Sequence, residues 1–297
     1  MTGALTICSL PPPIMAAMTQ VLLTVDTALS WASHARGESW RENLAASFDP
    51  RQLDLLRDHG LKACFFVDPM PAVVYGLEPI RRMVDPILAA GQEVQLQLHP
   101  VWQSVAEGVA EGARFELTCF DAEDQLDLIE TARDLLVEAG APRPVAFRSG
   151  GYAADVRTLA ALLEAGFRYD SSHNGSRHPD PSALPLAPDL AGPAELGGLI
   201  EVPVTEIGDA PEAALRNALR ARDPLVTLAG DSSVPECRFE RLCAFLASRA
   251  QALPTARFAD LGPLTVRASG EAPPQLWRRS GRASEPAWPN ALYRRSL

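Results

Sequence analysis

One structural unit recurs along the chain: an amphipathic helix, a glycine and then a short apolar strand. Gly60, Gly91, Gly140 and Gly166 each follow the last helical turn, where a left-handed cap favours glycine. The predicted strands are 21–26, 62–67, 93–98, 145–148, 168–171, 199–204 and 225–229, and the predicted helices are 50–59, 79–90, 121–139, 155–165, 210–221 and 235–252. Apolar strands that alternate with helices indicate an α/β protein whose parallel sheet is covered by helices.

The absence of a break in composition favours one domain. We predict a single irregular (β/α) barrel of about seven parallel strands. A doubly wound sheet is the alternative, but no glycine-rich phosphate loop follows the first strand. The barrel is expected to span 20–265, between an N-terminal extension at 1–19 and a Pro- and Arg-rich tail at 266–297. Translation could also start at Met15 or Met18, close to the first strand.

The charge distribution limits the choice of partners. The net charge is −10, which argues against nucleic acid or an anionic membrane as the main partner. Residues 268–297 carry a charge of +3, and we expect this basic tail to be a solvated, disordered end, with the binding of a protein partner as the alternative. The five cysteines show no CxxC spacing, and no apolar run reaches transmembrane length. A cytoplasmic location without a membrane span is therefore expected.

Polar residues follow most of the predicted strands. Asp26, Asp68, His99, Arg148 and Asp231 all stand at strand ends. In a (β/α) barrel, chemistry belongs at the carboxyl ends of the strands. A candidate site is therefore expected at that edge of the sheet.

Six segments in order carry a resemblance to a known family. They are VLLTVDT (21–27), GLKACFFVDP (60–69), GQEVQLQLHPVW (91–102), AFRSGGY (146–152), LIEVPVT (199–205) and LVTLAGDSS (225–233). This ordered set resembles the polysaccharide deacetylase family, also called the NodB-homology domain or carbohydrate esterase family 4. The resemblance covers roughly residues 20–260.

The resemblance implies a barrel that removes acetyl groups from N-acetylated sugars. In such a site a divalent ion activates water, an Asp accepts a proton, an Arg orients that Asp and a His protonates the leaving amine. Asp26 matches the base and Arg148 matches the orienting Arg. Asp231 stands where the family has its acid His, and we include these three as candidate catalytic residues.

The metal-binding positions depart from the family pattern. The residue after the base is Thr27 instead of Asp, and Ala28 follows it. Gln97 replaces the first His ligand, and Val101 stands at the second. One histidine does not hold zinc where three or four good ligands are usual. We therefore expect no cofactor and a pseudoenzyme that binds a glycan or glycan precursor, or regulates cell-surface polysaccharide metabolism.

The alternative is an active hydrolase that removes N-acyl groups from amino sugars. It would use no metal or a rearranged zinc site, for which His99 and His173 are the candidate ligands, although both could be ordinary hydrogen-bonded residues.

A carbohydrate ligand also needs residues that contact the sugar. The candidates are Trp31, Gln97, Trp102 and Tyr152. Aromatic rings stack on sugar rings, but a Trp beside a strand end could equally be a packing residue.

Overall fold

The structure is a computed structural model, and it describes residues 18–109, 114–174, 182–187, 189–207, 211–231, 234, 236–264, 266 and 268–270. Among these residues, no helix combines the length and the apolar character that a membrane span needs. Most of the predicted N-terminal extension and of the basic tail lies outside the described residues.

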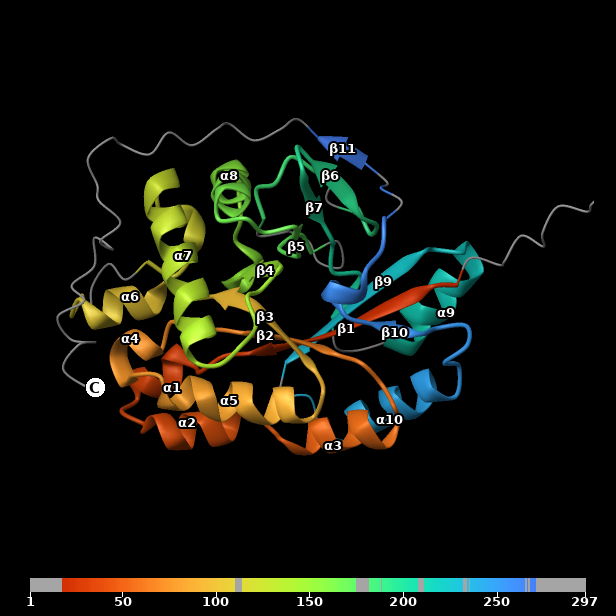
Figure 1. The fold of residues 1–297 in the computed structure, drawn as a ribbon, viewed down its shortest axis with the longest axis horizontal. Coiled ribbons are helices and arrows are strands. Elements are labelled where there is room, and N and C mark those ends of the chain that lie inside the picture. The colour runs from red at the N-terminus through yellow and green to blue at the C-terminus, as the bar shows by residue number, and fades with distance from the viewer. Residues whose placement is uncertain are drawn as a thin grey trace, which may run out of the picture.

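A single curled sheet runs through the molecule (Figure 1). Its strands are β1 (Gln20–Thr27), β2 (Cys64–Val67), β3 (Glu93–Leu98), β4 (Ala146–Ser149), β5 (Tyr169–Asp170), β6 (Ala194–Leu196), β7 (Leu199–Glu201), β8 (Glu206–Ile207), β9 (Leu225–Asp231), β10 (Thr255–Ala256) and β11 (Ala268–Gly270). Their order is β11-β6-β7-β5-β4-β3-β2-β1-β9-β8, with β10 added beside β1. All the pairings are parallel except that of β6 with β7.

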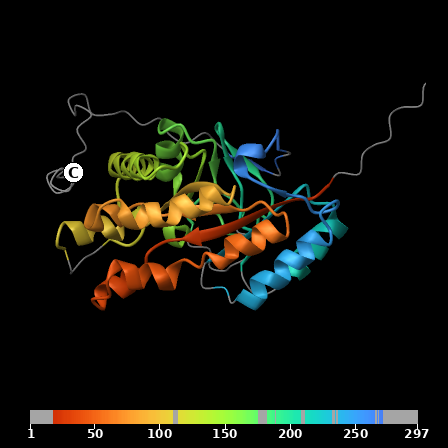
Figure 2. The same cartoon turned by 60° about the horizontal axis from the view of Figure 1, so that its bottom comes forward.

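The helices pack along this sheet. They are α1 (Trp31–Ala35), α2 (Trp40–Ser47), α3 (Arg51–Asp58), α4 (Ala72–Tyr75), α5 (Glu78–Ala89), α6 (Val101–Ala106), α7 (Ala122–Glu138), α8 (Val156–Glu164), α9 (Pro211–Ala221) and α10 (Glu236–Ala247). Short 3₁₀ turns occupy Leu117–Cys119, Gly150–Tyr152 and Phe258–Asp260. Figure 2 shows α3 and α10 side by side beneath the sheet, in agreement with their contacts.

The predicted α/β barrel is confirmed as a half-barrel, a curled and mostly parallel sheet. The predicted glycine caps all have positive φ: Gly60 at 65°, Gly91 at 71°, Gly140 at 108° and Gly166 at 83°. The sequence did not predict β6, β8, β10 and β11, which have two or three residues each and lie in no longer apolar run of the kind that indicated β5 and β7. β11 pairs with β6, so the sheet extends into the segment predicted to be a tail.

The strands bury both faces. On β1, Leu23 and Val25 belong to the large core under the helices, whereas Leu22 belongs to a smaller core inside the curl. Phe258 fills that interior, with its ring centroid 5.6 Å from those of Phe66 and Tyr169. Because side chains alternate along a strand, Thr24 and Asp26 continue the interior face of Leu22 toward the carboxyl end. The fold therefore places Asp26 above a filled core.

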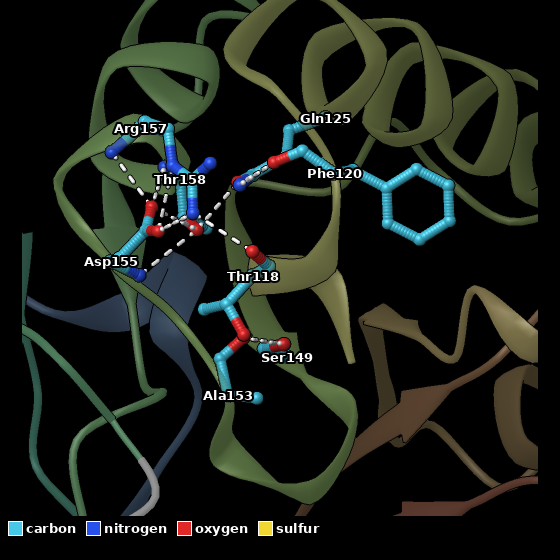
Figure 3. A network of polar contacts seen from close by, with 8 residues as sticks. All are labelled: Thr118, Phe120, Gln125, Ser149, Ala153, Asp155, Arg157 and Thr158. Atoms are coloured by element: carbon cyan, nitrogen blue, oxygen red, sulfur yellow. Dashed lines mark hydrogen bonds and ion pairs between the residues drawn. The ribbon is translucent and has the colours of Figure 1, made fainter. Parts of the chain in front are cut away.

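A buried polar network joins α7 to α8 (Figure 3). Asp155 caps α8, and its backbone N–H donates to Thr158 Oγ1 at 3.1 Å. The Thr158 hydroxyl donates to Gln125 Oε1 at 2.7 Å, and Gln125 donates to Phe120 O at 3.2 Å. Gln125 and Thr158 are fully buried, so each needs these partners.

We expect Thr158→Val to destabilise the protein by about 1–3 kcal/mol, because it leaves buried polar groups of Gln125 and Asp155 unpaired. Thr131→Val, at a partly exposed position of α7, should change the unfolding free energy by less than about 0.5 kcal/mol. Urea unfolding of the two variants and the wild type measures the difference. Equal losses in both variants would contradict the structural role of the network.

Candidate active site at the carboxyl edge

Two charged pairs occupy the interior of the half-barrel at its carboxyl edge. Asp26 ends β1 and Arg148 lies in β4. Asp68 follows β2 and His99 follows β3. The side chains meet across strands that are not all neighbours, because the sheet curls. The structure thus gathers the strand-end residues that the sequence predicted.

Arg148 is the central residue of this edge and is fully buried. Its Nη1 donates to Asp26 Oδ1 at 2.6 Å and to Thr24 Oγ1 at 3.0 Å. Its Nε and Nη2 donate to the backbone oxygen and the hydroxyl of Ser171, at 3.2 and 2.9 Å. Its Cζ lies 4.1 Å from the centroid of the Phe66 ring. One side chain therefore ties β1, β4 and the end of β5 together.

The electrostatics of this pair favour the charged form of Arg148. Burial lowers the pKa of Arg148, but the charge of Asp26 raises it, and the net pKa lies above the ordinary value. The side chain of Asp26 keeps 22% of its surface exposed. A carboxylate held by a buried guanidinium and open on one side can accept a hydrogen bond or a proton from a ligand.

His99 and Asp68 form the second pair. His99 Nδ1 lies 3.1 Å from Asp68 Oδ2, and Asp68 Oδ1 accepts the backbone N–H of Met70 at 3.0 Å. Asp68 is fully buried, whereas the His99 side chain is 32% exposed. Such an arrangement fixes the imidazole in one orientation and leaves its Nε2 for another partner.

Gly150 supports the ring of His99. A Cβ at Gly150 would lie 2.3 Å from His99 Cδ2, closer than any real contact, so only glycine fits. Packing around the ring lowers the pKa of His99, but the hydrogen bond and the charge of Asp68, with a further contribution from Asp26, raise it above the ordinary value.

The residues at the implied metal positions do not fit a metal ion. The Thr27 hydroxyl is buried and donates to Val25 O at 3.4 Å, and Val101 belongs to the apolar core. Gln97 offers only an amide, and no hydrogen-bond partner of its buried Oε1 is found in the described part of the chain. Among the described side chains, no three His, Cys, Asp or Glu residues lie close enough to hold an ion. A zinc or similar ion would need such a set.

His173 does not join His99 in a shared cluster. Its ring is buried, and its Nδ1 lies 3.3 Å from Ser182 Oγ. Its backbone N–H donates to Glu201 Oε1 at 3.0 Å. Among the described residues, no third ligand lies near either histidine, so a metal-binding role for His99 and His173 stays a prediction.

Asp231 is placed only by its backbone. It pairs in register with Asp26 on the neighbouring strand, while its side chain is not among the described ones. Its predicted catalytic role stays a prediction.

The aromatic residues predicted to contact a sugar differ in how much of their surface is exposed. Trp102 has no exposed surface and packs against the rings of His34 and Tyr75, so it offers no face to a sugar and is not retained as a contact residue. Tyr152 is partly exposed, with its ring centroid 5.9 Å from Arg148 Cζ. Trp31 is partly exposed and lies beside Phe115. Tyr152 and Trp31 stay candidate sugar contacts.

Sequence reasoning did not include three residues of the site among the candidates. Asp68 was noted at a strand end and lies in the segment GLKACFFVDP (60–69), but no catalytic or binding role was predicted for it. Ser171 and Thr24 contact Arg148 only because the sheet curls. Their spacing in the sequence carries no signal of these contacts.

We expect Asp26→Ala to lower the free energy of unfolding by about 3–5 kcal/mol, because it leaves the buried Arg148 charge without its partner. Asp54→Ala breaks an exposed pair with Arg57 and should cost less than about 1 kcal/mol. Denaturant unfolding compares the two. A cost for Asp26→Ala no greater than that of Asp54→Ala would refute the role given to this pair.

The His99–Asp68 pair leads to a prediction about how stability depends on pH. Because the folded-state pKa of His99 is raised, the stability that its protonation contributes is present below the ordinary histidine value and is lost as pH rises through the raised value. Asp68→Asn should lower the pKa of His99, which an NMR titration of its ring carbons measures. An unchanged His99 titration in this variant would rule out Asp68 as the cause.

Comparison with known proteins establishes the fold. No protein-family model and no curated protein sequence matches the chain. Several solved structures are similar to it, among them the following three. A Mycobacterium smegmatis protein provisionally assigned as a polysaccharide deacetylase has a TM-score of 0.59 at 20% identity, over 87% of this chain and 96% of that one. A 4-α-glucanotransferase from Thermococcus litoralis has a TM-score of 0.56 at 13% identity, over 86% of this chain and 42% of that one.

The third is a family 4 carbohydrate esterase from Streptomyces lividans, with a TM-score of 0.47 at 13% identity, over 84% of this chain and 97% of that one. The M. smegmatis structure aligns with almost its whole length, so the similarity extends over the half-barrel and its helices. The chain therefore has the irregular (β/α) barrel fold of the polysaccharide deacetylases.

Proposed function

We propose that the protein is a polysaccharide deacetylase-like protein that binds a glycan or glycan precursor without a metal ion. The observation that carries this proposal is the chemistry of the carboxyl edge. The charged pairs Asp26–Arg148 and His99–Asp68 are intact, while the metal positions hold Thr27, Gln97 and Val101. Such an edge can bind a polar ligand, but it lacks the metal ion that polarises the amide carbonyl in metal-dependent deacetylation.

The polar groups of the edge suit a carbohydrate. Asp26 has an exposed part that can accept sugar hydroxyl or amide hydrogens, and His99 Nε2 adds a second polar contact. Tyr152 stands beside this edge with part of its ring exposed, and aromatic faces pack against the apolar faces of sugar rings. In a cytoplasmic setting the ligand would be a precursor of a cell-surface polysaccharide, and the basic tail would contact a partner enzyme.

The pairing of His99 with Asp68 favours a second candidate, a hydrolase of N-acyl amino sugars that works without a metal. Asp26, held by Arg148, would accept a proton from water, and His99 would protonate the leaving amine. Hydrolysis requires proton transfer at both Asp26 and His99, whereas binding requires only that these residues form hydrogen bonds.

Calorimetric titration with N-acetylchitotetraose in the presence of a chelator tests the proposal. We expect wild type to bind, and Tyr152→Ala to weaken the affinity about tenfold through loss of a stacking face. Tyr75→Phe, in the aromatic cluster of Trp102, is the matched control and should bind as wild type does.

Incubation of the same oligosaccharide with the protein, followed by assay of released amine, separates the two candidates. Binding without amine release supports the binder. Amine release that the chelator leaves unchanged and Asp26→Asn abolishes supports the metal-free hydrolase. Absence of binding to acetylated and unacetylated oligomers alike would exclude both.

A further inference from the structure

Two acidic residues face each other in the seam between β5 and β7. Asp170 and Glu201 are register partners on these parallel strands, and neither has any exposed surface. They belong to neither charged pair of the carboxyl edge. A buried carboxylate needs a compensating charge or enough donors, so the pair calls for a physical account.

In each of these two carboxyl groups, the described hydrogen bonds reach only one of the two oxygens. Ser172 Oγ donates to Asp170 Oδ1 at 2.6 Å, and the backbone N–H of His173 donates to Glu201 Oε1 at 3.0 Å. The other oxygens, Asp170 Oδ2 and Glu201 Oε2, are buried, and no hydrogen-bond partner for either lies among the described residues. A bond between two carboxyl groups requires a proton, because ionised carboxylates only accept.

The electrostatics agree with this geometry. Burial raises the pKa of Asp170 to about 6. Burial, followed by the charge of Asp170, raises the pKa of Glu201 well above its ordinary value. Two adjacent carboxyl groups in a dry site do not both ionise at neutral pH.

Other charged groups on the surrounding elements do not neutralise the pair. Arg148 on β4 lowers the pKa of both carboxyls but is bonded to Asp26. The remaining titratable or charged residues on or beside the adjoining elements include Arg168 and Tyr169 before and on β5, His173 after β5, Glu195 on β6, and Asp155, Arg157 and Glu164 at or on α8. Arg168 donates to the hydroxyl of Tyr169. Arg157 is itself bonded to Asp155.

The seam also holds Arg148 in place, through the residues next to the acid pair. Ser171 follows Asp170, and Val202 follows Glu201. The Ser171 hydroxyl donates to Val202 O at 2.8 Å, and Val202 N–H donates to Asp170 O at 2.7 Å. Ser171 in turn accepts two hydrogen bonds from Arg148. Separation of β5 from β7 would therefore release Arg148 on one side.

We propose that Asp170 and Glu201 share one proton, and that this proton positions Arg148 by holding β5 against β7. Asp170 and Glu201 are positioning residues of the edge that contains Asp26, and their ionisation sets an alkaline limit on ligand binding. This last consequence rests on the proposed function, whereas the positioning of Arg148 does not.

The direction of the pH dependence follows from proton linkage. The folded protein holds a proton on the pair at pH values where the carboxyls of the unfolded chain, with pKa near 4, have lost theirs. The stability that this proton contributes is complete below that value and is lost as pH rises through the raised pKa of Glu201.

Glu201→Gln is the test variant, because the amide can donate to Asp170 Oδ2 while its oxygen still accepts from His173 N–H. It has no proton to lose. Glu240→Gln, at an exposed position of α10, is the matched control. Thermal unfolding is followed from pH 6 to pH 10. Wild type and the control should lose stability at alkaline pH, while Glu201→Gln should unfold roughly 4 °C or more above them at pH 10.

The positioning of Arg148 is measured in the same samples by the ¹³C NMR signal of its Cζ, assigned by comparison with Arg148→Lys. We expect the signal to shift with pH in wild type and to stay constant in Glu201→Gln. Affinity for N-acetylchitotetraose should fall about tenfold between pH 7 and pH 10 in wild type only.

The outcomes separate the inference from the proposed function. Parallel unfolding profiles for wild type and Glu201→Gln would overturn the shared proton. Diverging profiles with identical Arg148 signals would overturn the positioning role and leave a purely structural pair. An Arg148 signal that follows the pair, in a protein that binds no oligosaccharide at any pH, would support the positioning and reject the proposed function.

Discussion

The buried guanidinium of Arg148 is the interaction on which the carboxyl edge depends. A charge without solvent is stable only when its partners are fixed, and Arg148 finds them on β1 and after β5. Asp26 supplies the opposite charge, and Ser171 supplies two acceptors. These contacts cross the interior of the curled sheet and so require its curvature. At this edge the fold and the site therefore depend on each other, because a sheet without this curl would leave the charge of Arg148 unpaired.

In the proposed account, ion pairs rather than a metal ion organise this edge. The polar side chains of the edge are oriented by ion pairs. Arg148 orients Asp26, and Asp68 orients His99 against Gly150. Gln97 offers an amide at a position where the resemblance implies an imidazole, and its buried oxygen has no partner within the described ranges. Ligand recognition needs only such fixed hydrogen-bonding groups, while amide hydrolysis also needs the carbonyl to be polarised. This difference is the physical reason for preferring a binding function.

Much of the fold followed from the sequence, because it rests on local patterns. The glycine caps and the apolar strands were predicted, and so was the approach of Asp26 and Arg148 to one edge. What escaped prediction depends on contacts between distant segments. The burial of Trp102 comes from packing against α1 and α4. The pairing of Asp68 with His99, and of Asp170 with Glu201, comes from strand register, which a single sequence does not display.

The most direct test of a metal-independent edge is the content of divalent metal per chain. Elemental analysis would use protein purified without a metal-binding tag and without chelator, together with His99→Ala. The account predicts far less than one equivalent in both proteins, because the described donors do not form a metal site. About one equivalent in the wild type, lost in His99→Ala, would contradict it and make His99 a ligand.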